Sequence, residues 1–95
     1  MASKAYVIFT EEIHDPEGMK AYGKAAAAAM GGAKVLAVDA KPQVLEGNWH
    51  GHQTVVLEFE TVEAAQAWYD SDAYRSARVL RQAAADTNAA ILSGF

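Results

Sequence analysis

The chain has 95 residues, a formal net charge of −4 and no cysteine. This length suits one domain rather than two. The acidic balance disfavours nucleic acid as a partner. The lack of cysteine excludes disulfide bonds and thiolate metal sites, and it fits a reducing, cytoplasmic compartment. The longest apolar run, residues 25–30, is far too short to span a membrane, so no membrane partner is expected.

The first part of the chain predicts a strand, a helix and a second strand. Residues 5–11 are rich in aromatic and β-branched side chains, which is typical of a strand. Asp15 is placed to cap a helix that begins at Pro16, apolar residues follow at helical spacing, and Gly31–Gly32 ends the helix. Residues 33–38 predict the second strand.

The middle of the chain predicts an edge strand, a loop and a further strand. Pro42 interrupts the preceding pattern, and residues 43–46 are expected to form a short edge strand. Residues 48–53 predict a loop. Residues 54–59 give the clearest strand pattern of the chain.

The last third predicts two helices and a closing strand. Thr61 is expected to cap the first helix and Asp72 the second. A break at residues 87–88 is expected before a terminal strand at residues 89–95. The apolar face of the second helix is expected to consist of Ala73, Ala77, Leu80 and Ala84.

This order of elements predicts one α+β domain over residues 1–95, a ferredoxin-like sandwich with helices on one face of an antiparallel sheet. A sheet covered on one side should alternate apolar and polar residues, but these strands are apolar on both faces. Monomers rarely expose so large an apolar patch, so we expect a homodimer in which two sheets enclose a barrel-like core. The residues expected on the face away from the helices are Tyr6, Ile8, Val56 and either Leu36 or Leu92.

Several segments carry a family resemblance: residues 44–49 (VLEGNW), 54–59 (TVVLEF) and 64–74 (AAQAWYDSDAY), with the pair Arg78 and Arg81. They resemble the family catalogued as domain of unknown function 1330, over nearly the whole chain. The resemblance implies a ferredoxin-like protomer of the dimeric α+β barrel superfamily. It implies no particular reaction, because the family has no settled activity.

The sequence departs from the pattern of that family in two places. Residues 38–41 (VDAK) stand where the family tends to have an Arg-Gly-Gly-like segment. Residues 50–52 (HGH) follow the tryptophan of the turn, where the family tends to be basic. A binding role of those family positions therefore does not carry over to this chain.

The best candidate for a binding site lies around the break between the last two predicted helices. Trp68, Tyr69 and Tyr74 supply aromatic walls, and Arg78 and Arg81 return to the helical face of Tyr74. Such groups suit a planar anionic molecule, a carboxylate or phenolate, in a cleft between helices and sheet. Alternatively, Trp68 is a core residue and the arginines pair with acidic residues at the surface.

The histidines give weaker signals. His14 precedes Asp15 and is a candidate acid–base group, although Asp15 is already assigned to capping. His50 and His52 are spaced to chelate zinc or copper on an extended backbone, but no third ligand lies nearby, so an exposed loop and no metal are expected. No phosphate-binding loop or dinucleotide fingerprint occurs, and no cofactor is predicted.

Two classes of function stay open. The first is a dimeric module that binds a small, anionic or aromatic metabolite in a cleft between helices and sheet. The second is a cofactor-independent enzyme, monooxygenase- or isomerase-like, since the superfamily implied by the resemblance includes such enzymes. In an enzyme, His14, Tyr74 and Arg81 would converge on one cavity.

Overall fold

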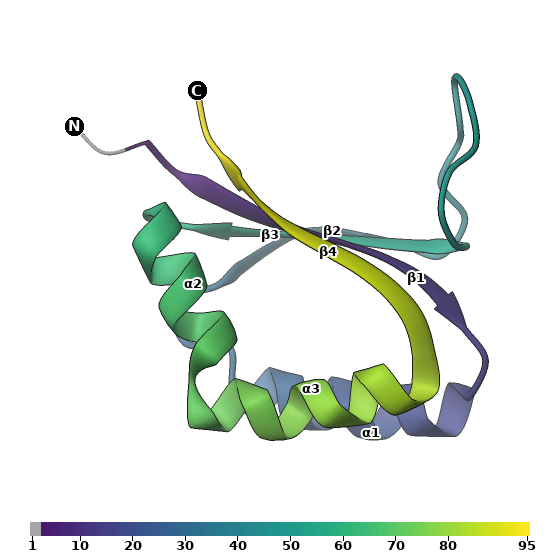
Figure 1. Cartoon of the computed structure of the whole chain (residues 1–95), viewed down its shortest axis with the longest axis horizontal. Coiled ribbons are helices and arrows are strands. Elements are labelled where there is room, and N and C mark those ends of the chain that lie inside the picture. Colours follow the sequence, from purple (N-terminus) through teal and green to yellow (C-terminus); the bar gives the residue numbers. More distant parts are fainter. Residues whose placement is uncertain (1–2) are drawn as a thin grey trace.

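The computed structural model describes residues 3–95 as four strands and three helices (Figure 1). The strands are β1 (Ala5–Ile13), β2 (Lys34–Asp39), β3 (Gln53–Phe59) and β4 (Ala85–Ser93). The helices are α1 (Pro16–Ala28), α2 (Val62–Asp70) and α3 (Asp72–Ala84). No helix in the described part of the chain is long and apolar enough to cross a membrane.

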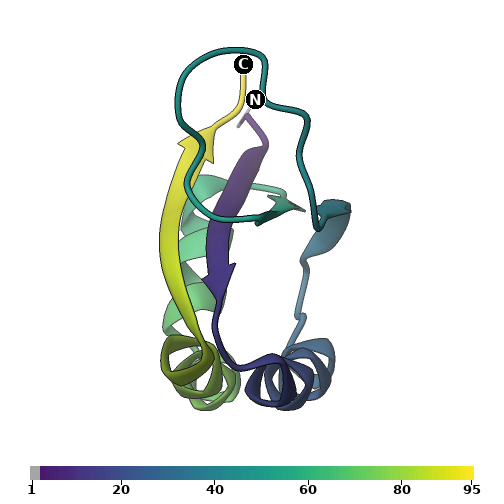
Figure 2. The ribbon, with the colours of Figure 1, turned by 90° about the vertical axis from the view of Figure 1, so that its right-hand side faces the viewer.

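The strands form one antiparallel sheet in the order β2-β3-β1-β4, with the helices on one side. Figure 2 shows α1 and α3 side by side beneath the sheet. The two β-α-β units interleave, since each outer strand pairs with an inner strand of the other unit. The predicted ferredoxin-like α+β fold is therefore confirmed.

The connection between β2 and β3 corrects one prediction. Residues 43–46, expected as an edge strand, form no strand. They belong to a long loop, residues 40–52, that projects away from the sheet (Figure 1). Within residues 3–95, no strand lies beside residues 43–46 to pair with them.

The junction between α2 and α3 corrects a second prediction. The N-cap of α3 is Ser71 and not Asp72, because Ser71 Oγ accepts the amide proton of Tyr74 at 3.2 Å. Ser71 also ends α2, and its hydroxyl donates to the Trp68 carbonyl at 2.7 Å. One residue therefore serves both helices, and Asp72 is the first residue of α3.

The buried face of α3 is rotated from the predicted one. Ala77 and Ala84 are buried as expected, but Ala73 and Leu80 are exposed. Tyr74 and Arg81 are buried in their place. The helix α3 packs beside α1, and the Tyr74 ring contacts the ring of Tyr22 on α1. The buried residues of α3 are Tyr74, Ala77, Arg81 and Ala84.

The predicted break at residues 87–88 is also wrong. Strand β4 begins at Ala85, immediately after α3, and pairs with the whole length of β1. The polar residues Thr87 and Asn88 stay in the strand because Glu11 and Thr10 of β1 lie opposite them.

The core lies between the sheet and the helices and centres on Trp68. Its indole ring lies 3.9 Å from the Tyr74 ring and 5.1 Å from the Phe59 ring, between centroids. Its Nε1 donates to the carbonyl of Ala29, the C-cap of α1, at 2.8 Å. Trp68 therefore joins α2 to α1, α3 and the sheet.

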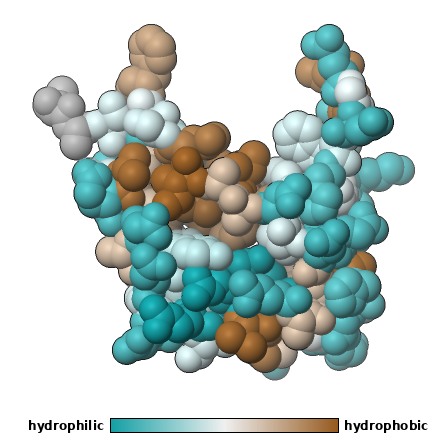
Figure 3. Space-filling model, in the orientation of Figure 1, coloured by the Kyte–Doolittle hydropathy of each residue, from teal (hydrophilic) through white to brown (hydrophobic). Residues whose placement is uncertain are grey.

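The other face of the sheet is uncovered and apolar. Tyr6 lies opposite Leu92, and Ile8 lies opposite Val56, so these side chains share the face away from the helices. Figure 3 shows apolar side chains gathered there between two projecting parts of the molecule. Leu45, on the projecting loop, is 85% exposed.

Replacing Trp68 by alanine should lower the free energy of unfolding by about 3–5 kcal/mol, because a large buried side chain and its packing are lost. Urea denaturation of the two proteins measures the difference. Val79→Ala, at an exposed position of α3, is the control and should change little. A near-neutral Trp68→Ala variant would contradict the core role.

Candidate functional site

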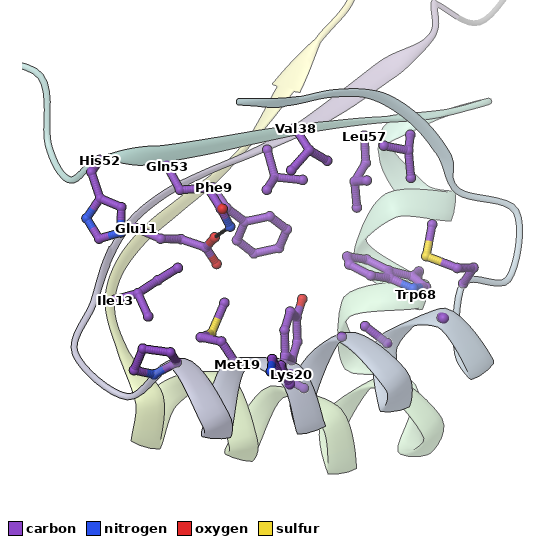
Figure 4. A pocket seen from close by; sticks show the side chains of 18 residues that line it. Phe9, Glu11, Ile13, Met19, Lys20, Val38, His52, Gln53, Leu57 and Trp68 are labelled. Carbon is purple, nitrogen blue, oxygen red and sulfur yellow. Dashed lines mark hydrogen bonds between the residues drawn. The ribbon is translucent and has the colours of Figure 1, made fainter. Parts of the chain in front are cut away.

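A cavity of about 660 Å³ lies between α1 and the sheet (Figure 4). Trp68 closes the end of the cavity opposite Glu11. Val35 and Val38 line it and are still 52% and 60% exposed, so the cavity opens along the edge strand β2. Its apolar wall includes Phe9, Met19, Met30, Val55, Leu57 and Trp68.

The cavity exists because of the composition of α1. No residue of this helix is fully buried. Tyr22 reaches α3, and the small residues Gly23, Ala26 and Ala27 line the cavity without filling it. An added Cβ at Gly23 would meet nothing within 4 Å. The helix therefore packs beside α3 and leaves space below β2 and β3.

The polar end of the cavity is formed by β1 and β3. Glu11 is only 2% exposed, and Gln53 Nε2 donates to its Oε1 at 2.9 Å. The His52 amide donates to the Glu11 carbonyl at 3.0 Å. Figure 4 shows the Glu11 carboxylate directed into the cavity beside Gln53.

Gly51 allows this close approach of the loop to β1. Its φ of +74° is a left-handed conformation that favours glycine, and a Cβ there would overlap the carbonyl of Glu11. The end of the 40–52 loop is thereby fixed against β1. This contact places His52 and Gln53 around Glu11.

A second polar group consists of Tyr22, which lines the cavity, and Tyr74, which lies behind it. The hydroxyls of Tyr22 and Tyr74 are 2.8 Å apart. Burial is the main cause that raises the pKa of Tyr22, and the Tyr74 hydroxyl raises it further. Tyr22 lines the cavity as a neutral phenol at pH 7, because its pKa is raised.

Arg81 is buried beside these tyrosines. It is 3% exposed, and its guanidinium carbon lies 4.9 Å from the centroid of the Phe9 ring and 5.9 Å from that of Tyr22. Burial acts to lower the pKa of Arg81, but interaction with the Tyr74 phenol raises it, and the net direction is upward. Its Nε has no hydrogen-bond partner within residues 3–95.

The structure divides the residues that the sequence singled out. Trp68 lines the cavity, while Tyr74 and Arg81 lie behind its wall. Tyr69 and Arg78 lie on the outer side, where the Arg78 guanidinium carbon is 4.4 Å from the centroid of the Tyr69 ring. Tyr69 and Arg81 also border a separate hollow of about 390 Å³ beside the start of β4.

The histidines do not converge on one point. The backbone amide of His14 donates to the carbonyl of Ala84 at 3.0 Å, and the His14 side chain is exposed and does not line the cavity. His50 Nδ1 lies 2.8 Å from Thr10 Oγ1, and His52 Nδ1 lies 3.4 Å from Glu12. No group of three potential metal ligands occurs among the residues that the structure describes.

Sequence reasoning did not single out Glu11, Gln53 or Tyr22 as site residues. A signal for Glu11 was present. It shares the face of β1 that carries Val7 and Phe9, so period-two alternation puts a carboxylate at a core position. A charged residue at such a position indicates a partner or a site.

The fold and cavity define a ferredoxin-like α+β protein with a pocket between α1 and the sheet. The model of the family described as Domain of unknown function (DUF1330) matches residues 4–95. The chain belongs to this family, and the resemblance seen in the sequence is confirmed. No curated protein shows a significant match.

Solved structures share this fold. The RPA0582 protein of unknown function from Rhodopseudomonas palustris is 21% identical, with a TM-score of 0.77, covering 100% of this chain and 85% of that one. A dimeric ferredoxin-like protein of unknown function from Thermobifida fusca is 17% identical, with a TM-score of 0.69, covering 98% and 92%.

An enzyme is also among the similar structures. SnoaB, a cofactor-independent oxygenase from Streptomyces nogalater, is 8% identical, with a TM-score of 0.69, covering 99% of this chain and 95% of that one. At these identities, the likeness to solved structures shows the fold alone.

The raised pKa of Tyr22 predicts a loss of stability in alkali. A buried phenol keeps its proton longer than the same phenol in the unfolded chain, so its contribution is complete below about pH 10 and lost as the pH rises further. Titration of tyrosinate absorbance should show a late component from Tyr22 in the folded protein.

That late component should disappear in Tyr22→Phe and persist in Tyr6→Phe, where the phenol is removed from the opposite face of the sheet. The fall of the unfolding free energy above about pH 10 should be smaller in Tyr22→Phe. Identical titrations of folded and urea-unfolded protein would contradict the assignment.

Proposed function

We propose that the protein binds a small, largely apolar aromatic molecule in the cavity between α1 and the sheet. The cavity itself carries the proposal. Its volume of about 660 Å³ lies within the roughly 300–1,000 Å³ of small-molecule sites. Apolar walls with a few polar groups at one end are also typical of such sites.

The side chains of the cavity favour an aromatic ligand. Phe9, Tyr22 and Trp68 offer ring edges and faces, and the sulfurs of Met19 and Met30 suit contact with an aromatic ring. Arg78 and Arg81 do not line the cavity. The geometry therefore supports the aromatic part of the expected ligand better than the anionic part.

The uncovered sheet face supports a homodimer as part of the proposal. Leu36 and Leu92 are 45% and 49% exposed. The 40–52 loop projects on the side of the sheet away from the helices (Figure 1). A second copy facing this sheet would bury the apolar patch. The similar structure from Thermobifida fusca is described as dimeric. A cytoplasmic location, expected from the lack of cysteine, belongs to the same proposal.

A cofactor-independent enzyme is the second candidate, and the buried Glu11 favours it. A carboxylate directed into an apolar cavity is able to accept a proton from a bound substrate. The cofactor-independent oxygenase among the similar structures supplies an analogy of fold only. Consumption of a bound compound, as opposed to its reversible binding, distinguishes the two functions.

Val56→Asp should break the dimer, because it would bury an unpaired charge between two sheets. Light scattering coupled to size exclusion should give wild type twice the chain mass of 10.2 kDa and the variant the chain mass alone. Val79→Asp, the same change on the exposed side of α3, should stay dimeric. A dimeric Val56→Asp variant would count against face-to-face sheets.

Gly23→Leu should fill the cavity and weaken naphthalene binding by about tenfold or more, measured by quenching of tryptophan fluorescence. Its stability should not fall, because leucine favours the helix over glycine. Ala28→Leu adds the same side chain to an exposed position of α1 outside the cavity and should bind as wild type does. Equal binding by all three proteins would place the ligand elsewhere.

A further inference from the structure

Glu11 is a charged side chain at a core position. Val7 and Phe9 precede it on the same face of β1, and all three are buried. Burial of a carboxylate is costly unless hydrogen bonds or an opposite charge stabilise it. The contacts of Glu11 therefore indicate which polar groups of a ligand this end of the cavity favours.

The hydrogen bonds of Glu11 are incomplete. Gln53 is its one side-chain donor, and it forms no ion pair among residues 3–95. Lys20, which also lines the cavity, lies 3.7 Å from Glu17 instead. An ionised carboxylate offers about four acceptor sites. The carboxylate of Glu11 thus has acceptor capacity left on the side that Figure 4 shows facing the cavity.

The position of this acceptor is fixed before any ligand arrives. Glu11 and Gln53 lie directly opposite each other in the β1–β3 register. The His52 amide binds the Glu11 carbonyl at 3.0 Å, and Gly51 permits that contact. Preorganised groups of this kind give a site its specificity, because they lose little freedom on binding.

The opposite end of the cavity has no comparable group. Leu57, Met30 and Trp68 line it, and the indole N–H of Trp68 is already used by the carbonyl of Ala29. A ligand that fills the cavity therefore has an apolar body with one polar end at Glu11. An apolar ligand would leave Glu11 without a partner, and a carboxylate ligand would face a like charge.

We infer that the Glu11 end of the cavity selects aromatic molecules that carry a hydrogen-bond donor, such as a phenolic hydroxyl, and disfavours aromatic carboxylates. This inference rests on the proposed function, since it names the ligand class of the same cavity. One oxygen of the Glu11 carboxylate accepts a hydrogen bond from the ligand, while Gln53 Nε2 donates to the other oxygen. This differs from the arginine-bound anion that the sequence suggests.

Three ligands that share the naphthalene ring test the inference: 2-naphthol, naphthalene and 2-naphthoate. Each is titrated calorimetrically at neutral pH. Wild type should bind 2-naphthol about ten- to a hundredfold tighter than naphthalene, the range of a hydrogen bond to a charged group. It should bind 2-naphthoate most weakly, because that ligand brings a second carboxylate to Glu11.

Glu11→Gln removes the charge and keeps a similar shape. This variant should bind 2-naphthoate about tenfold tighter than wild type does and should lose most of the preference for 2-naphthol. Glu63→Gln is the matched control, because it makes the same change at an exposed residue of α2 outside the cavity. Its affinities should equal those of wild type.

The wild-type ranking decides the inference even if Glu11→Gln does not fold. Equal affinities for the three ligands, or tightest binding of 2-naphthoate, would overturn the inference and leave the cavity as a binding site. The latter result would point to Lys20 or His52 as the polar contact. Absence of binding by all three ligands would instead refute the proposed function, and the inference with it.

Discussion

The contacts of Trp68 hold the helical layer against the sheet. The indole belongs to α2, lies against the rings of Tyr74 on α3 and Phe59 on β3, and donates to Ala29 at the end of α1. A fold of 95 residues buries a smaller fraction of its surface than a larger protein does, so one large side chain that joins four elements dominates the core. The same indole closes one end of the cavity. Stability and the shape of the site therefore depend on the same residue.

The two faces of the sheet have separate proposed roles, ligand binding and assembly. The face with Phe9 and Glu11 borders the cavity, and the face with Ile8 and Val56 is proposed to meet a second copy. Alternation along β1 and β3 sends successive side chains to these opposite faces. A substitution on one face is therefore expected to change ligand binding or assembly, but not both.

Local patterns in the sequence predicted most of the fold, and contacts between distant elements account for what they missed. Runs of β-branched and aromatic residues located β1 and β3, and the caps Asp15 and Thr61 fixed the start of two helices. The buried face of α3 was mispredicted because Arg81, a charged residue, packs in the core. A cleft between helices and sheet was expected, but most of its lining residues were missed, because the space lies between α1 and the sheet and no single segment encodes it. Of the expected site residues, Trp68 is the one that lines it.

The proposed function requires that this cavity binds an aromatic ligand. Nuclear magnetic resonance of the methionine methyl groups tests it directly, because Met19 and Met30 both line the cavity and an aromatic ring shifts nearby methyl signals. Titration with 2-naphthol should move both signals along one saturable curve and leave the Ile8 methyl signals, on the uncovered face, in place. Stationary Met19 and Met30 signals, or shifts confined to Ile8, would contradict the account.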